Sequence, residues 1–362
     1  MKYQHVVQAV FGTPWMVRPE TLDTIAALVR FRAAGGHLTD AEVRERVDGA
    51  ADAAGPRRGA RTMGAIGVIP IYGLLMPRAN LMTEMSGGST VAGIRDAFRA
   101  AMEDESVGSI LFDVDSPGGV VDGIEELATE IRDARGRKPI VAIADYSMAS
   151  AAYYLGAQAD EVVASPSARV GWIGTVMAHT EYSKADEIAG ITTTVFRNPP
   201  GKAGANEFEP LSDKARAELQ QAVDDYSAQF VAAVAKGRGV SPATVREDYG
   251  QGGGMSAARA KAAGLVDRVE SFDATIRRLA TGKGPVPRGT SAVAPSAPYT
   301  LAGESVADEP AADEIISTLE ETDGPPLTGE QDPDDTSGLP PAQITDQEDT
   351  ELLRMRHRAH TR

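Results

Sequence analysis

The stretch from Asp145 to Ala157 constrains the fold of this chain more than any other feature. An apolar, β-branched run at 139–144 leads into it and predicts a buried strand, and the residues from Ala151 onward predict a buried helix. Ser150 therefore lies at a strand-to-helix corner, where backbone N–H groups gather at the positive end of the helix. This geometry suits a nucleophile beside an oxyanion site, although a serine among alanines is more often a packing residue.

Strands and helices alternate on both sides of this corner. The apolar pattern predicts further strands at 65–75, 109–114, 161–164, 170–178, 192–197 and 265–269, and helices at 91–102, 121–134, 211–237 and 256–263. An alternation of this kind is typical of an α/β fold with a largely parallel sheet. Before it, residues 1–60 read as a helical N-terminal segment and linker, with one helix after Pro19 and a short one after Thr39.

The negative charge of the chain is concentrated in one segment near its C-terminus. Between Glu304 and Glu351 there are 16 acidic residues and no lysine or arginine, whereas the rest of the chain holds 36 acidic and 36 basic residues. The balanced body predicts no general affinity for nucleic acid. The Pro- and Gly-rich segment 282–351 is expected to be disordered, and the arginine-rich end 352–362 is typical of an interaction tail. Residues 61–281 are left as the folded domain.

Several kinds of site are excluded or disfavoured by composition. Cysteine is absent, so disulfides, thiolate metal sites and a cysteine nucleophile are ruled out. The five histidines show no metal-binding spacing in the body of the chain, so neither a metal site nor a cofactor is expected. We expect no membrane-spanning helix and no secretory signal, because no long apolar run is present.

Three segments elsewhere in the chain bear on Ser150. Paired glycines, Gly118 and Gly119, follow the strand at 109–114 in a predicted strand-to-helix turn and leave N–H groups free to meet a substrate carbonyl. A loop at 197–210 presents Lys202, which becomes a general base if desolvation lowers its pKa. The rival base is His179, which would make a Ser-His-acid arrangement. Taken singly, each of these residues is more often structural or solvent-exposed.

The order of these motifs resembles the signal peptide peptidase A family of the Clp protease/crotonase superfamily. It reads S-P-G-G at 116–119, Y-S-M-A-S-A-A-Y-Y at 146–154, S-A-R-V-G-x-I-G at 167–174, G-K-A-G at 201–204 and A-A-G-L-V-D at 262–267. The resemblance covers about Ile66 to Val269 and implies a Clp/crotonase-like fold of repeated β-β-α units. Within the family, phage head maturation proteases are most similar, because of Pro14-Trp15, the residues 177–184 and the missing membrane anchor.

The resemblance also implies roles for individual residues. Ser150 matches the family's nucleophile and Lys202 its general base, while Gly118, Gly119 and Ala151 match the oxyanion donors. One departure concerns Trp172, since many relatives have at this position a serine that helps to hold the lysine. Thr175 is a candidate substitute for that serine, and His179 a possible accessory residue.

The predicted function is that of a serine endopeptidase of phage capsid maturation with a Ser/Lys dyad. It is expected to work inside the procapsid, assembled in the host cytoplasm, and to cut scaffold, itself and capsid or portal proteins. These proteins are the expected partners, with a homo-oligomer and neither nucleic acid nor membrane. Two main alternatives stay open: a soluble bacterial peptidase of the same family, and a catalytically inactive scaffold or assembly protein on the same fold. Acyl-CoA chemistry on a crotonase-like fold is disfavoured by the Ser/Lys placement.

Overall fold

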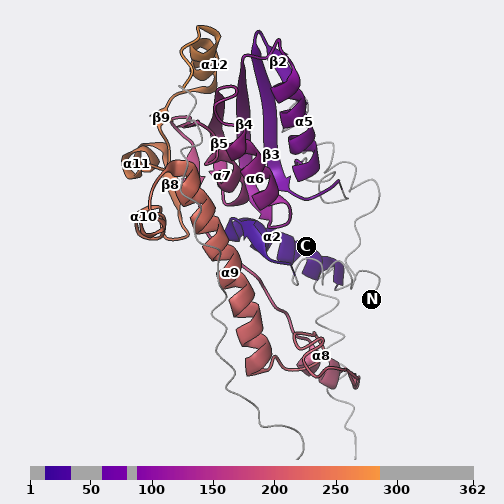
Figure 1. The fold of residues 1–362 in the computed structure, drawn as a ribbon. Coiled ribbons are helices and arrows are strands. Elements are labelled where there is room, and N and C mark those ends of the chain that lie inside the picture. The colour runs from indigo at the N-terminus through magenta and orange to yellow at the C-terminus, as the bar shows by residue number, and fades with distance from the viewer. Residues whose placement is uncertain (1–12, 34–58, 80–87, 286–362) are drawn as a thin grey trace, which may run out of the picture. The chain divides into compact units, whose positions relative to one another are not determined.

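The computed structural model describes residues 13–33, 59–79 and 88–285, and its centre is a mixed β-sheet (Figure 1). The main path of the sheet has the strand order β2-β3-β4-β5-β6-β9. The strands span Arg61–Met63 (β2), Ile66–Leu75 (β3), Ser109–Val120 (β4), Ile140–Ala149 (β5), Glu161–Ala164 (β6) and Arg268–Val269 (β9). Neighbouring strands from β3 to β9 run parallel, and β2 is an antiparallel edge strand. The predicted α/β fold with a largely parallel sheet is confirmed.

Helices cover both faces of this sheet, which explains why its strands are apolar almost throughout. On one face lie α5 (Val91–Glu103), α6 (Ile124–Asp133) and α7 (Ala151–Gly156), and on the other lies α12 (Phe272–Ala280). Alternate side chains of β4 serve the two cores: Phe112 packs in the cluster that includes α5, α6 and α7, and Leu111 packs with Leu279 of α12. The buried strand predicted at 139–144 extends in the structure to Ala149.

The C-terminal end of β5 leaves β6 and pairs with a second, smaller ladder. Here β5 runs parallel to β7 (Arg169–Gly171), which pairs antiparallel with β8 (Gly254–Ser256). The helices α10 (Pro242–Asp248) and α11 (Ala257–Ala263) flank β8 in sequence, and α11 ends at Gly264 as the pattern predicted. The strand predicted at 170–178 is much shorter in the structure, where β7 ends at Gly171. Gly171 and Trp172 both have positive φ angles, which end the ladder.

The N-terminal segment contains one predicted element and one that was missed. The helix α2 (Pro19–Ala33) confirms the helix predicted after Pro19. The short strand β1 (Trp15–Val17) was not predicted, and it pairs antiparallel with the end of β4. The second short helix, predicted after Thr39, lies outside the described residues. So does the predicted tail from residue 286 onward, including the basic end 352–362. The domain boundaries therefore stay predictions.

The prediction that Gly118 and Gly119 form a strand-to-helix turn is wrong, because β4 continues through them to Val120. Gly118 is paired with Leu74 of β3 and Gly119 with Leu75, after a register shift in the ladder. The physical reason is the absence of side chains: a Cβ on Gly119 would lie 2.0 Å from the Leu75 carbonyl oxygen. Glycine thus lets backbones approach closely enough to extend the strand.

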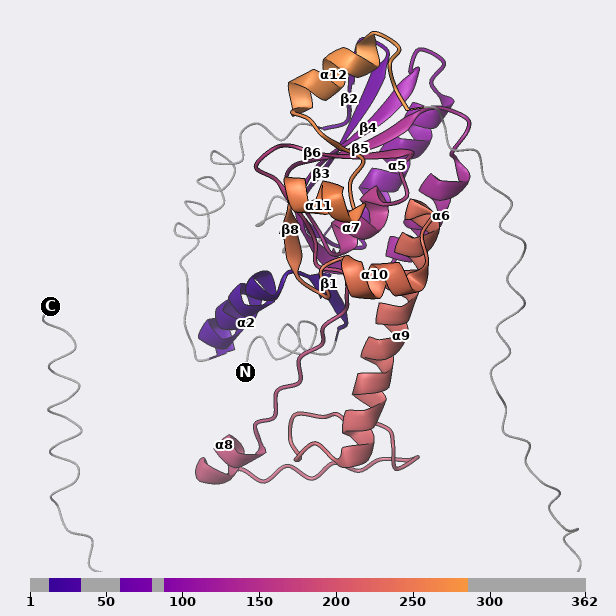
Figure 2. The ribbon, with the colours of Figure 1, turned by 90° about the vertical axis from the view of Figure 1, so that its left-hand side faces the viewer.

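A long helix, α9 (Asp213–Arg238), projects from the sheet, and its C-terminal end is the end that lies at the body. Its C-terminal part packs in the main core through Phe230 and Val234, while its N-terminal end is joined to α8 (Ser183–Ile188) at a distance from the sheet (Figures 1 and 2). We name residues 183–212 the arm. The strand predicted at 192–197 is wrong: these residues form no strand and are largely exposed, since no neighbouring strand in the described chain is paired with them.

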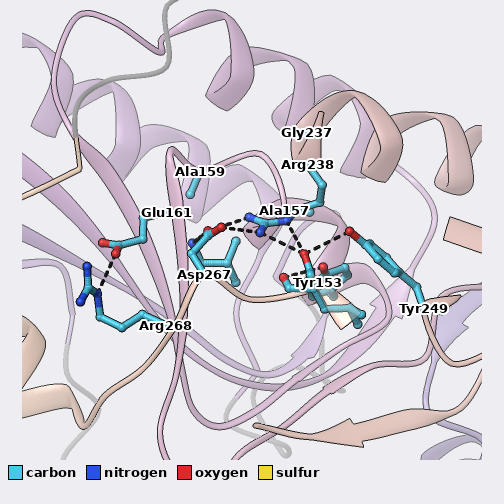
Figure 3. Close-up of polar contacts among 12 residues, drawn as sticks. Tyr153, Ala157, Ala159, Glu161, Gly237, Arg238, Tyr249, Asp267 and Arg268 are labelled. Atoms are coloured by element: carbon cyan, nitrogen blue, oxygen red, sulfur yellow. Dashed lines mark hydrogen bonds and ion pairs between the residues drawn. The ribbon is translucent and has the colours of Figure 1, made fainter. Parts of the chain in front are cut away.

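A buried polar cluster fixes α9 to the body at its C-terminal end (Figure 3). The Arg238 guanidinium donates to both carboxylate oxygens of Asp267, at 2.8 and 2.6 Å. Beside it, the Tyr153 hydroxyl donates to the Leu265 carbonyl at 2.8 Å, and the Tyr249 hydroxyl donates to the Gly264 carbonyl at 3.0 Å. Burial raises the pKa of Tyr153, so its hydroxyl stays a neutral donor. Because Tyr153 belongs to α7, the cluster also fixes the helix that follows Ser150.

Candidate active site

Ser150 occupies the corner between β5 and α7 in a backbone conformation that is rare for a residue with a side chain. Its φ angle is 52° and its ψ angle is −118°. Such a conformation costs on the order of 1–3 kcal/mol and persists only where the surroundings enforce it. Here the Ser150 N–H donates to the Gly171 carbonyl at 2.8 Å, and its carbonyl accepts from the Tyr154 N–H at 2.9 Å. Strained strand-to-helix corners of this type hold the nucleophile in α/β-hydrolases.

The hydroxyl of Ser150 is buried and makes no hydrogen bond. The residue is 1% exposed, and its Oγ has no hydrogen-bond partner. An unpaired buried hydroxyl is normally unfavourable by about 1–3 kcal/mol, so its retention needs an explanation other than stability. The corner also depends on small neighbours, because Gly118 lies so close that a Cβ there would meet the Ser150 Cβ at 3.0 Å. The predicted nucleophile and one predicted oxyanion glycine are therefore adjacent.

The N–H groups of the three predicted oxyanion donors differ in the partners that the chain gives them. Ala151 is the first residue of α7, so its N–H has no partner inside the helix. The Gly118 N–H donates to the Ser116 hydroxyl at 3.1 Å. Gly119 is paired with Met16 of β1 on one side and with Leu75 of β3 on the other. Both glycines are thus engaged by the chain itself, and Gly118 is the one that lies beside Ser150.

Lys202 lies on the arm, away from Ser150. It belongs to the loop that precedes α9, its side chain is exposed, and its N–H donates to the Pro199 carbonyl at 3.0 Å. The 26 residues of α9 give that helix a length of about 39 Å, and only its far end packs against the core. Within a single chain, the structure brings Gly118 and Ala151 to Ser150 but does not bring Lys202.

The two accessory candidates lie on the segment that follows β7. Thr175 donates its N–H to the Ser227 hydroxyl at 3.2 Å, but its own Oγ1 is buried without a partner, as is Nε2 of His179. Neither side chain hydrogen-bonds to Ser150, whose hydroxyl has no partner. The structure therefore contains no Ser-His pair at this corner.

Trp172, which stands where a hydroxyl was expected, serves as a packing platform. Its ring covers Gly254 of β8, where a Cβ would lie 2.3 Å from the nearest ring atom. The guanidinium groups of Arg169 and Arg18 lie 5.2 and 5.7 Å from the ring centroid, a distance at which cation–π attraction acts. Trp172 thus joins β8 and the N-terminal segment to the loop after β7.

No group of three or more histidine, aspartate or glutamate side chains suited to a metal ion occurs among the described residues. No described helix combines the length and the apolar character that a membrane span requires.

Sequence reasoning missed the strand at Trp15–Val17, which lies directly against the glycines of the site. Pro14-Trp15 had served only as a mark of the family, although three apolar residues ahead of Arg18-Pro19 are compatible with a short buried strand.

Residues 132–285 match the model of peptidase family S49, a range that includes Ser150, Lys202 and the loop after β7. The family recognition made from the motifs is thereby confirmed.

Two phage proteins are similar to this chain over a longer range. Capsid assembly protease C of Escherichia phage lambda is 31% identical over 287 residues, which cover 75% of this chain and 64% of that protein. Head-tail preconnector protein GP5 of Enterobacteria phage P21 is 32% identical over 186 residues, covering 51% of this chain and 37% of that protein. The chain therefore spans less than two thirds of the length of either relative.

Among solved structures, the 1510-N membrane-bound stomatin-specific protease in complex with a substrate peptide aligns with a TM-score of 0.36 and 15% identity. The alignment covers 58% of this chain and 77% of that one.

Proposed function

We propose that this chain is a serine endopeptidase of phage capsid assembly in which Ser150 is the nucleophile. The observation that carries the proposal is the Ser150 corner: a strained backbone, a buried hydroxyl without a partner, and Gly118 in contact. The names of the two phage relatives support the capsid context. Scaffold, capsid or portal proteins are the proposed substrates and partners, and the procapsid in the host cytoplasm is the proposed location.

In the proposed mechanism, the Ser150 hydroxyl attacks a peptide carbonyl while a neutral Lys202 takes its proton. The N–H groups of Gly118, Gly119 and Ala151 stabilise the oxyanion, and each such donor contributes about 10²–10³ in rate. Lys202 then gives that proton to the leaving amine as the peptide bond breaks, which leaves the acyl group on Ser150. Water that Lys202 activates hydrolyses this acyl-enzyme, and the proton returns to Ser150. This assignment requires the Gly118 and Gly119 N–H groups to turn from their present partners to the substrate.

Lys202 of one copy cannot complete the site of the same copy in the arrangement described, so we propose that it acts on a second copy. The arm supports this assignment, because it exposes large apolar side chains that a monomer leaves in water. Ile188 is 89% exposed and Phe196 is 92% exposed. Large apolar side chains exposed to this extent on one segment are expected at a protein contact. A homo-oligomer formed through the arm would bury them and bring a lysine to each serine.

Replacement of the nucleophile tests the proposed function. Ser150→Ala is expected to abolish self-cleavage and the cleavage of co-expressed capsid protein, measured by gel and by N-terminal sequencing of the fragments. Ser147→Ala is the matched control, because Ser147 lies on the same strand and its hydroxyl is also buried without a partner. Ser147→Ala should cleave like the unchanged chain.

One alternative keeps a specific observation in its favour. The separation of Lys202 from Ser150 within one chain also fits a catalytically inactive assembly protein on the same fold. That protein would show no cleavage in the unchanged chain, with or without Ser150. Cleavage that Ser150→Ala abolishes would exclude it.

A further inference from the structure

The N-terminal segment, Thr13–Arg18, runs as an extended strand between two parts of the chain that border the candidate site. On one side, Trp15, Met16 and Val17 pair antiparallel with Val120, Gly119 and Gly118, respectively. The Arg18 N–H extends this ladder by donating to the Pro117 carbonyl at 2.9 Å. On the other side, Trp15 exchanges two hydrogen bonds with Val176, at 2.8 and 2.9 Å. The segment is thus held by backbone pairing on both of its edges.

This segment reaches the nucleophile. A Cβ placed on Gly118 would lie 2.2 Å from the Met16 carbonyl oxygen and 3.0 Å from the Ser150 Cβ. The Met16 carbonyl oxygen and the Ser150 side chain therefore lie no farther apart than the sum of those two distances. In addition, the pairing partner of Met16 is Gly119, a predicted oxyanion donor. The backbone of Met16 therefore lies close to the Ser150 side chain and is paired with a predicted oxyanion donor.

An extended peptide that binds a protein commonly adds itself to an exposed strand, and its backbone pairs with that strand. A peptidase must in addition present the peptide carbonyl to its nucleophile and oxyanion donors. The strand Gly118–Val120 meets both requirements when β1 is absent. With β1 in place, Gly119 is paired and Ser150 is 1% exposed, so a second peptide has no access.

We propose that Gly118–Val120, together with Val176, forms a binding site for an extended peptide, and that the N-terminal segment fills this site from within the same chain. The described structure is then a closed form, which opens when β1 leaves its place. This inference rests on the proposed peptidase function, because it assigns the substrate's position at the Ser150 site.

The packing of β1 fits an occupant that is able to leave. Trp15 and Val17 do not join the main core but form a small cluster with Leu22 and Ile25 of α2 and with Leu74 and Val120. Arg18 over Trp172 fastens the other end of the segment. Trp172 thus helps to hold β1 in place, which a serine at this position would not do, because it has no ring for Arg18 to contact.

The occupant also indicates which peptides the site accepts. Side chains of a strand alternate between its two faces. Trp15 and Val17 face the cluster with α2, whereas Met16 is buried with the main core cluster that contains Ala151 and Ala152. A substrate would place its side chain at the Met16 position in this apolar core. We expect an unbranched apolar side chain there.

The test measures peptide binding in the full chain with Ser150→Ala, so that no cleavage intervenes. The probe is a fluorescent peptide with the sequence of residues 13–18. Met16→Pro removes the N–H that faces Gly119 and should release β1, whereas Met16→Leu keeps both the pairing and the apolar side chain. We expect the Met16→Pro chain to bind the peptide at least tenfold more tightly than the Met16→Leu chain. Trp15→Ala, which removes the largest side chain of the small cluster, should shift binding in the same direction and serves if Met16→Pro does not fold.

Equal binding by the Met16→Leu chain and by the folded Met16→Pro or Trp15→Ala chain would overturn the inference, and so would the absence of binding to all of them. The same substitutions in the chain with Ser150 intact are then assayed for casein cleavage. Increased peptide binding together with increased cleavage supports both proposals. Increased binding without any cleavage leaves the peptide site in place and refutes the proposed peptidase function, so the two failures are distinguishable.

Discussion

At the scale of single residues, the candidate site depends on positions where an ordinary side chain does not fit. Gly118 has a φ angle of 101° and lies between the Met16 carbonyl and Ser150. Ser150 itself holds a φ angle of 52°. Both conformations are unfavourable for most residues, and they are adjacent in space. Strain concentrated at one point is typical of functional sites, because the surrounding fold has to enforce it.

Gly118→Ala tests this arrangement. The new methyl group would lie 2.2 Å from the Met16 carbonyl oxygen, at a φ angle that alanine rarely adopts. We expect the free energy of unfolding to fall by about 2–4 kcal/mol, as positive φ and overpacking together imply. Denaturant unfolding gives the value. Gly59→Ala is the control, since a Cβ on Gly59 meets no atom within 4 Å, and a comparable loss in both variants would contradict the argument.

Asp115 gives a pH-dependent prediction. Its side chain keeps contact with solvent, but partial desolvation and the Asp145 carboxylate raise the pKa of Asp115, while Arg18 opposes the rise. A raised pKa means that the folded chain binds more protons than the unfolded chain, so this group lowers stability as pH rises from about 4 through its raised value. Asp115→Asn should therefore have a higher Tm than the unchanged chain at pH 7, and the difference should vanish near roughly pH 3.

The exposed Asp96 of α5 provides the matched control for this pH series. Asp96→Asn removes the same charge at a position remote from Asp145 and Arg18 in sequence. Thermal unfolding of the three proteins between pH 3 and pH 7 is the measurement. Identical Tm differences for Asp115→Asn at both ends of that range would show that the Asp115 carboxyl does not behave as described.

At the scale of elements, the long helix α9 is fastened at one end only. Its last residue, Arg238, is nearly buried and makes a bidentate ion pair with the Asp267 carboxylate (Figure 3). Tyr153 of α7 and Tyr249, which follows α10, lie beside this pair (Figure 3). The first turns of α9 carry the arm and lack such contacts with the sheet (Figure 2). The orientation of the arm therefore depends on the polar cluster around Arg238.

Arg238→Ala should be strongly destabilising. It removes the guanidinium that pairs with the Asp267 carboxylate and one of the two side-chain donors to the Gly264 carbonyl, the other being the Tyr249 hydroxyl. Loss of one partner of a buried ion pair costs about 3–5 kcal/mol. Arg216→Ala, at an exposed position of the same helix, should change the free energy of unfolding by less than about 0.5 kcal/mol. Urea unfolding distinguishes them, and similar small losses in both would mean that the cluster does not hold α9.

At the scale of the whole molecule, the proposed chemistry needs two distant segments, Ser150 in the body and Lys202 on the arm. A single copy leaves the apolar side chains of the arm in water and the Ser150 hydroxyl without a base. Assembly of several copies would remedy both deficits. The proposed peptide site adds a second level of control, because β1 must leave before any substrate reaches the assembled site.

Mixing inactive chains tests the assembly. Ser150→Ala and Lys202→Ala should each be inactive on casein, while their mixture should regain activity, because sites that combine Ser150 from one copy with Lys202 from another are intact. His179→Ala is the control and should keep most of its activity alone. A mixture as inactive as its parts, at concentrations where the unchanged chain cleaves, would rule out the contribution of a second copy. An active Lys202→Ala chain would rule out lysine as the base.

Features that depend on neighbouring residues were predictable from the amino-acid sequence. They include the corner at Ser150, the helices that begin after Thr90 and Ser212, and the parallel sheet, since apolar periodicity and helix caps act within a few residues. The motif order also identified the peptidase family correctly.

Only the tertiary structure decided how these parts meet. The glycine pair looked like a turn but continues a strand, because the backbones of β3 and β1 fit against residues without side chains. The segment 192–197 looked like a strand but lacks a neighbour to pair with. Most important, Trp15–Val17 lies beside Ser150 although more than a hundred residues separate them in the chain. Contacts of this kind are set by backbone pairing and packing between remote segments, which local residue patterns do not encode.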